Sequence, residues 1–129
     1  MKLSIASSLL IACIVAISWA GCSKDSQNPD YINDVDCTSI VANTNTYTLA
    51  IKDIMDNSCA LGGCHDAVTK EHGLDLSTYS GVKFGFESHD ILCSVNHGSG
   101  CDPMPEGSSK LPQATLDQLA CWAKNGYIQ

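Results

Sequence analysis

Two thiols and an imidazole lie close together at residues 59–65, which read Cys-Ala-Leu-Gly-Gly-Cys-His. Covalent haem attachment needs this set of groups, because each sulfur forms a thioether to a vinyl carbon and the adjacent imidazole is then held over the iron. The usual spacing has two residues between the cysteines, and here the additional residues are small or flexible, so they can bulge outward. The segment therefore predicts one haem c attached to Cys59 and Cys64, with His65 as an axial iron ligand.

Helical periodicity predicts the elements that would position this segment. Residues 47–57 carry apolar side chains at helical spacing and lead directly into the cysteine-histidine segment. Ser77 can cap a helix of one or two turns through residues 79–82. Residues 86–110 contain several glycines and prolines and predict a loop. A last helix over residues 111–124 places four apolar side chains on one face: Leu116, Leu119, Ala120 and Ala123. With no strand-like alternation, we expect a mainly α fold of three to four helices with long loops.

The order of these pieces resembles the single-haem domain of class I c-type cytochromes, over roughly residues 47–127. The likeness rests on a helix, the cysteine-histidine segment, a Gly-Leu-Asp-Leu run, a Met104-Pro105 loop and a terminal Leu-x-x-Leu-Ala-x-Trp-x-x-Asn-Gly helix. In that family a loop methionine before the last helix is the second iron ligand, so the resemblance implies His65/Met104 ligation. Such a soft, neutral ligand suits electron transfer. The resemblance thus implies a small cytochrome c-like fold over residues 46–129 and electron transfer to and from redox partner proteins.

Other side chains compete for these roles. His72, His89 and His97 can each supply a second imidazole to the iron, and His97 is the best placed of the three because it lies near two cysteines. Each can equally be a surface histidine. Met55 lies on the first predicted helix and is expected in the core, and Met104 can instead be a methionine that fills a gap in packing.

The N-terminus predicts export. Met1-Lys2 precede a nearly uncharged apolar run that ends in Ala20-Gly21-Cys22, which resembles the lipobox of bacterial lipoproteins. We expect a lipoprotein signal peptide at residues 1–21, a lipid anchor on Cys22, and a position facing the periplasm or on the outer-membrane surface. An uncleaved membrane anchor is the alternative. Residues 22–45 are rich in serine, asparagine, aspartate and threonine and predict a polar tether.

Six of the eight cysteines remain once Cys13 has left with the signal peptide and Cys22 carries lipid. If two of the six hold a haem, four can form disulfides, as is common in exported domains. Four thiols allow three pairings, and the sequence alone does not choose among them. We favour Cys93 with Cys101, which closes a short loop, and Cys37 with Cys121, which ties the N-terminal segment to the last helix.

Charge and length exclude several classes of function. Removal of residues 1–21 leaves 108 residues, enough for one small domain. The formal net charge of −7, with lysine as the only strongly basic residue type, excludes a nucleic-acid footprint and fits a basic redox partner. No glycine-rich phosphate loop or supported nucleophile is present, so we do not expect an enzyme.

Two alternatives to electron transfer stay open. The first is a disulfide-stabilised lipoprotein without haem that acts as a structural or binding module, with three disulfides among the six cysteines. The second is a metal site formed by Cys59, Cys64, His65 and one further ligand, although adjacent Cys64 and His65 would strain tetrahedral coordination.

Overall fold

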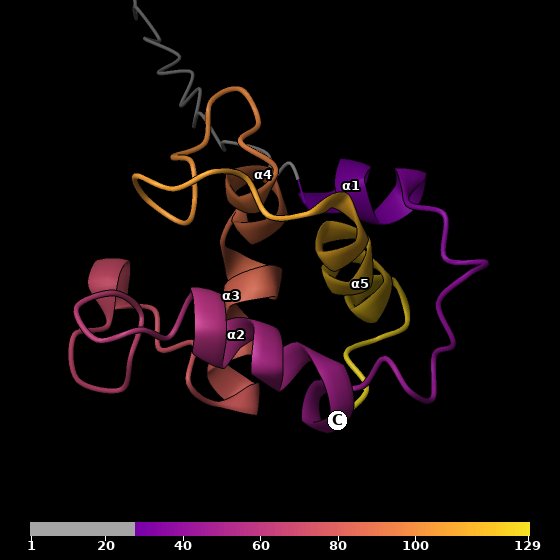
Figure 1. Ribbon diagram of the computed structural model, residues 1–129, viewed down its shortest axis with the longest axis horizontal. Coiled ribbons are helices and arrows are strands. Elements are labelled where there is room, and N and C mark those ends of the chain that lie inside the picture. The colour runs from indigo at the N-terminus through magenta and orange to yellow at the C-terminus, as the bar shows by residue number, and fades with distance from the viewer. Residues whose placement is uncertain (1–27) are drawn as a thin grey trace, which may run out of the picture.

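The computed structural model describes residues 28–129, which form helices joined by loops (Figure 1). Within this range there is no strand, so the prediction of a mainly α fold is confirmed. The predicted signal peptide and the lipidation of Cys22 lie outside the described residues. In chain order the elements are α1 (Asn28–Asp34), the π-helical turn η1 (Tyr47–Ile51), α2 (Lys52–Ser58), the 3-10 turn η2 (Glu71–Gly73), α3 (Tyr79–Ser88), α4 (Ile91–Val95) and α5 (Gln113–Lys124).

None of the helices in the described range combines the length and the apolar character needed to cross a bilayer.

The core is built around Trp122 on α5, whose side chain is completely buried. Its indole Nε1 donates a hydrogen bond to the carbonyl of Ile128 at 2.8 Å, so the only polar atom of the ring is satisfied. The apolar face predicted for the last helix is buried. Four aromatic rings surround the indole, with centroids 5.0 to 6.3 Å away: Tyr127, Phe86, Tyr47 and Tyr79.

The helix predicted at residues 47–57 forms as two continuous elements, η1 and α2. Thr46 caps the start, because its hydroxyl accepts a hydrogen bond from the backbone N–H of Leu49. The backbone N–H of Lys52 donates to the carbonyl of Tyr47, which widens the first turn. The C-terminal segment holds this turn in place, since the N–H of Tyr47 donates to the carbonyl of Ile128 at 2.8 Å. Met55 is buried in the core, as expected.

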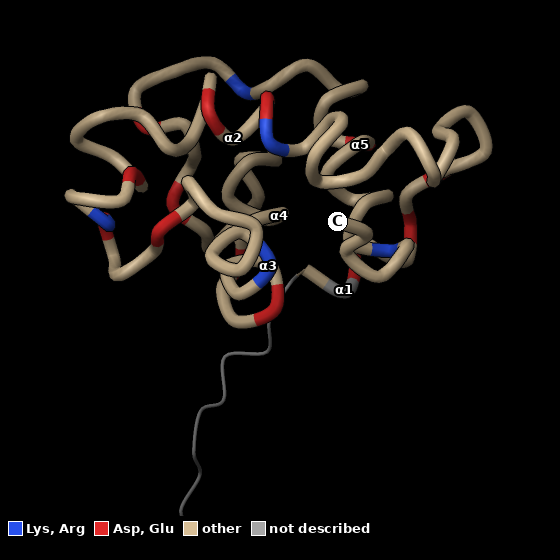
Figure 2. Tube along the Cα trace, turned by 90° about the horizontal axis from the view of Figure 1, so that it is seen from below, with Lys and Arg blue, Asp and Glu red and all other residues tan. Residues whose placement is uncertain are grey.

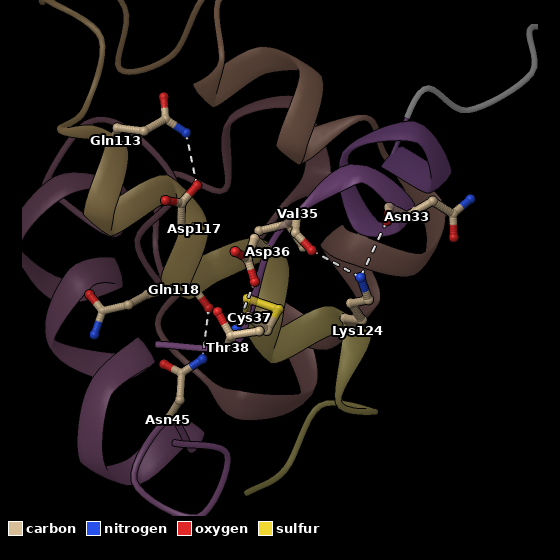
Figure 3. The surroundings of a disulfide bond; sticks show 11 residues. Asn33, Val35, Asp36, Cys37, Thr38, Asn45, Gln113, Asp117, Gln118 and Lys124 are labelled. Atoms are coloured by element: carbon tan, nitrogen blue, oxygen red, sulfur yellow. Dashed lines mark hydrogen bonds between the residues drawn. A yellow bond between two sulfur atoms is a disulfide. The ribbon is translucent and has the colours of Figure 1, made fainter. Parts of the chain in front are cut away.

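The segment predicted to be a polar tether contains α1 in its described part, and α1 lies against α4 and α5 (Figure 1). Asn28 is buried, and its side-chain amide donates to the carbonyls of Phe86 and His89, while its Oδ1 accepts from the N–H of Leu92. Figure 3 shows the Cys37–Cys121 disulfide that fastens the following residues to α5. The segment is therefore held by polar contacts and a covalent bond, together with Tyr31, Ile32 and Val35, which pack partly buried against the core.

The prediction of a loop over residues 86–110 is wrong for roughly its first third, which is mainly helical. Helix α3 continues to Ser88 and α4 occupies Ile91–Val95, whose side chains are largely buried. Tertiary packing stabilises this short helix, and the Cys93–Cys101 disulfide ties its middle to the loop that follows. The cap of α3 also differs from the expected one, since Thr78 accepts from the N–H of Gly81 and Ser77 instead binds Asp75.

Candidate functional site

A cavity of about 600 Å³ lies between the loop that follows α2 and the loop that follows α4. In Figure 1 both loops project from the same side of the molecule, away from α1 and α5. All four residues that the sequence singled out for haem chemistry line this cavity: Cys59, Cys64, His65 and Met104. We call it the thiol pocket.

Backbone hydrogen bonds fold residues 59–65 into a tight loop. The N–H of Cys64 donates to the carbonyl of Leu61 at 2.9 Å, and the N–H of His65 donates to the carbonyl of Cys59 at 3.2 Å. Gly63 supports this path with a φ of +87°, in the left-handed region that favours glycine. The loop therefore brings two cysteines that are separated by four intervening residues to the same pocket.

A carboxylate organises the next part of the loop. Asp66 accepts hydrogen bonds from the backbone N–H groups of Thr69, Val68 and Gly63, at 2.7 to 3.0 Å. These hydrogen bonds hold the pKa of the Asp66 carboxyl far below its ordinary value, and the bond from the N–H of Thr69 is the largest cause. The loop is thus ordered by a charged group that stays ionised over the whole neutral range.

The two cysteines of the pocket are free thiols with different surroundings. Cys64 is exposed, whereas Cys59 is half-buried at the end of α2. Burial, and then the charge of Cys64, raise the pKa of the Cys59 thiol to about 11. Cys64 is therefore the more accessible of the two thiols.

His65 is oriented by a backbone carbonyl. Its side chain is 9% exposed, and Nδ1 lies 3.0 Å from the carbonyl oxygen of Glu71. Because a carbonyl can only accept, Nδ1 carries a proton and donates to Glu71, and in the tautomer with that single ring proton Nε2 is an acceptor. Glu71, on the turn η2, supplies the carbonyl that orients the ring.

Met104 approaches the pocket from the opposite wall. Its backbone N–H donates to the carbonyl of Ser94 at 3.0 Å, and its own carbonyl lies 3.2 Å from Nε2 of His97. The Met104-Pro105 peptide bond is cis. His97 therefore supports the loop that carries Met104 and does not line the pocket.

The other two histidines named from the sequence lie at the pocket. His72 is exposed on η2, and His89 is half-buried with its ring centroid 5.6 Å from that of Phe84. The thiol pocket also has an apolar lining. It consists of buried side chains from the loop after η2 and from α4: Leu74, Leu76, Ile91 and Val95.

A second cavity, of about 540 Å³, lies beside α1 and α5 and was not expected from the sequence. Four aspartates contribute to its wall: Asp30, Asp34, Asp36 and Asp117. Figure 3 shows that Asp117 is bonded to Gln113 and Asp36 to Thr38, so these acids have partners within the protein.

Family models, curated proteins and solved structures were all compared with this chain, and none of them matches it.

The function predicted from the sequence, electron transfer through a haem iron, is wrong. A metal centre needs several donor side chains that converge on one point, and no group of three or more His, Cys, Asp or Glu side chains among residues 28–129 is arranged to hold a metal ion. The same finding excludes the four-ligand site with Cys59, Cys64 and His65. Four of the six cysteines instead form two disulfides, Cys37–Cys121 and Cys93–Cys101, which are the pairs that the sequence favoured. These bonds fit the alternative of a disulfide-stabilised module.

Proposed function

We propose that the chain is an exported, lipid-anchored binding module, in which a small helical scaffold with two disulfides binds a small, largely apolar ligand in the thiol pocket. The observation that carries this proposal is the pocket itself. Its volume of about 600 Å³ falls within the range of sites for small molecules. Four buried aliphatic side chains give it an apolar surface, as such sites usually have.

The two walls of the pocket are preformed. On one side, backbone hydrogen bonds and the Asp66 carboxylate order the loop that carries the thiols. On the other side, the Cys93–Cys101 disulfide and the bond from Met104 to Ser94 fix the facing loop. Binding to ordered walls costs less conformational entropy than binding that must first order them. The scaffold thus favours ligand binding.

The proposed location agrees with the cysteine chemistry. Disulfides form and persist outside the reducing cytosol, and the two in this structure support export of the chain. The lipid anchor on Cys22 is part of the proposal and accounts for the lipobox-like sequence.

The first experiment asks what the exported, full-length product carries. We expect a colourless protein, with a mass that accounts for the polypeptide from Cys22, its acyl chains and two disulfides, and with two thiols that react with Ellman's reagent after unfolding. Haem staining that survives denaturing electrophoresis would overturn the proposal, since only thioether-bound haem persists there. This measurement also tests the predicted attachment of haem c to Cys59 and Cys64.

The second experiment measures binding with the neutral apolar dye N-phenyl-1-naphthylamine. We expect saturable fluorescence enhancement, about tenfold weaker binding in Ser94→Phe, and unchanged binding in Ser80→Phe. Ser94 lies on α4 in the pocket wall, whereas Ser80 lies on α3 and does not line the pocket, so the same substitution serves as a control. Bound dye should also slow the alkylation of Cys64, which needs no variant. Absence of saturable binding would contradict the proposal.

A further inference from the structure

The polar groups of the thiol pocket carry mostly one sign of charge. Four carboxylates line it, on η2 and on the loops on either side of α4: Glu71, Asp90, Asp102 and Glu106. Among the lysines in the described part of the chain, none contributes to the lining. Figure 2 shows acidic residues outnumbering basic ones along the loops at this end of the molecule. The pocket mouth therefore attracts positive charge and repels negative charge.

The side chain of His65 lies inside this ring of acids. The residue is about nine-tenths buried and lines the pocket, and its Nδ1 donates to the carbonyl of Glu71. No group of the described residues is hydrogen-bonded to Nε2, and Nε2 is not a buried unsatisfied atom, so it is accessible from the pocket. In the tautomer with its proton on Nδ1, Nε2 accepts a hydrogen bond, so a ligand with an N–H or O–H donor can bind there.

The rest of the lining indicates which kind of positively charged ligand fits the pocket. A metal ion is excluded by the absence of a converging donor set in the described chain. The buried side chains of Leu74, Leu76, Ile91 and Val95 require instead an apolar surface on the ligand. An organic molecule with an apolar body and a protonated amine meets all three conditions.

We propose that the thiol pocket selects an organic ammonium ion, with its apolar body against the aliphatic lining and its N–H groups directed at Nε2 of His65 and the surrounding carboxylates. This proposal rests on the proposed binding function and adds the class of ligand. Ammonium groups donate and carry positive charge, so they satisfy the acceptor and the acids together. An anionic head group has no proton to donate to Nε2 and would meet four like charges.

The test compares three probes that share a naphthalene body. N-phenyl-1-naphthylamine is neutral, 1-anilinonaphthalene-8-sulfonate is an anion, and N-(1-naphthyl)ethylenediamine is a cation at neutral pH. The neutral dye is bound first, and the two charged probes are then used to displace it. We expect the cation to displace it at a concentration at least about tenfold lower than the anion, and the preference to shrink as salt is added.

Two double variants with the same change in net charge separate the pocket acids from the overall charge. Asp102→Asn with Glu106→Gln should reduce the cation preference to about threefold or less, with little change in the affinity of the neutral dye. Asp53→Asn with Glu87→Gln removes two exposed acids outside the pocket and should leave the preference unchanged. An equal fall in both double variants would overturn the role of the pocket acids.

The outcomes for the two proposals are distinguishable. If the neutral dye binds but the anion displaces it as well as the cation does, the ammonium proposal is wrong and the binding function stands. If the neutral dye does not bind, both fall together. A preference that does not respond to salt would also overturn the electrostatic reasoning.

Discussion

The Cys37–Cys121 disulfide is expected to contribute more stability than Cys93–Cys101, although the two are similarly buried. Each bond joins one completely buried half-cystine, at 121 or at 93, to a partner of intermediate exposure. Replacing both cysteines of either pair by alanine thus removes similar packing. The pairs differ in the length of chain that they close, since their sequence separations are 84 and 8 residues.

A cross-link stabilises the folded protein mainly by restricting the unfolded chain, and the restriction grows with the logarithm of the loop length. For separations of 84 and 8 residues the relation gives about 4.6 and about 2.5 kcal/mol at 25 °C. The difference of about 2 kcal/mol depends only on the ratio of the two lengths. In a domain of this size it corresponds to on the order of 10 °C in Tm.

Urea unfolding of the mature chain, followed by Trp122 fluorescence, measures this difference. Trp19 lies in the predicted signal peptide, so Trp122 is the only tryptophan left and reports on the core. Mass spectrometry should show that each double-alanine variant keeps its other disulfide, and similar slopes against urea make the free energies of unfolding comparable. The reasoning is refuted if Cys93→Ala with Cys101→Ala costs as much as Cys37→Ala with Cys121→Ala.

Three further predictions concern the pocket loop and the glycines of α3. Iodoacetamide at about pH 8 should alkylate exposed Cys64 well before Cys59. Burial raises the pKa of Cys59 to about 11, so only about one in a thousand of its thiols is ionised at that pH. Peptide mass spectrometry over time measures both alkylation rates, and equal rates would contradict this prediction. Hydrogen bonds lower the pKa of Asp66, so its contribution to loop order is full above about pH 4 and is lost as the pH falls further. The backbone amides bonded to Asp66 should lose their protection from hydrogen exchange as the pH falls in the native chain, and should not show this change in Asp66→Asn. In urea unfolding, Gly81→Ala should lower the free energy of unfolding by at least about 1 kcal/mol more than Gly85→Ala. The new Cβ at residue 81 would lie 1.8 Å from the backbone oxygen of Asp75, whereas the one at residue 85 would lie 2.6 Å from the flexible end of the Ile91 side chain. Equal losses of stability in the two variants would contradict this reasoning.

Hydrophobic periodicity predicted the elements that bury one clear face. The last helix and the helix before Cys59 form as expected, because their apolar side chains recur at helical spacing and contact the core. The pairing of Cys93 with Cys101, favoured because it closes a short loop, is present in the structure, although the sequence alone did not choose among the three pairings. The cysteine-histidine segment and Met104 line the same pocket, but their predicted roles toward a haem stay predictions.

Elements held by polar or tertiary contacts could not be predicted in this way. Helix α1 is fastened by the Asn28 amide and by Lys124, whose Nζ donates to the carbonyls of Asn33 and Val35 (Figure 3). Helix α4 is too short to form without packing. The prediction of electron transfer through a haem iron was wrong for a similar reason. Cys64 and His65 are adjacent in sequence, but adjacency does not determine whether enough donor side chains converge in space to hold a metal ion.

The disulfide that contributes more to the stability of the fold, Cys37–Cys121, should contribute less to ligand affinity than Cys93–Cys101. Cys37–Cys121 lies at the junction of the N-terminal segment and α5, and neither cysteine lines the thiol pocket. Cys101 lines the pocket, and its bond to Cys93 restrains the loop that carries Met104. A wall freed by loss of that bond must be ordered again when ligand binds, and this entropy cost weakens affinity. We therefore expect Cys93→Ala with Cys101→Ala to bind N-phenyl-1-naphthylamine more weakly than Cys37→Ala with Cys121→Ala, under conditions in which both variants are folded, even though it is the more stable of the two. Equal loss of affinity in both variants would show that the disulfide does not order the pocket wall.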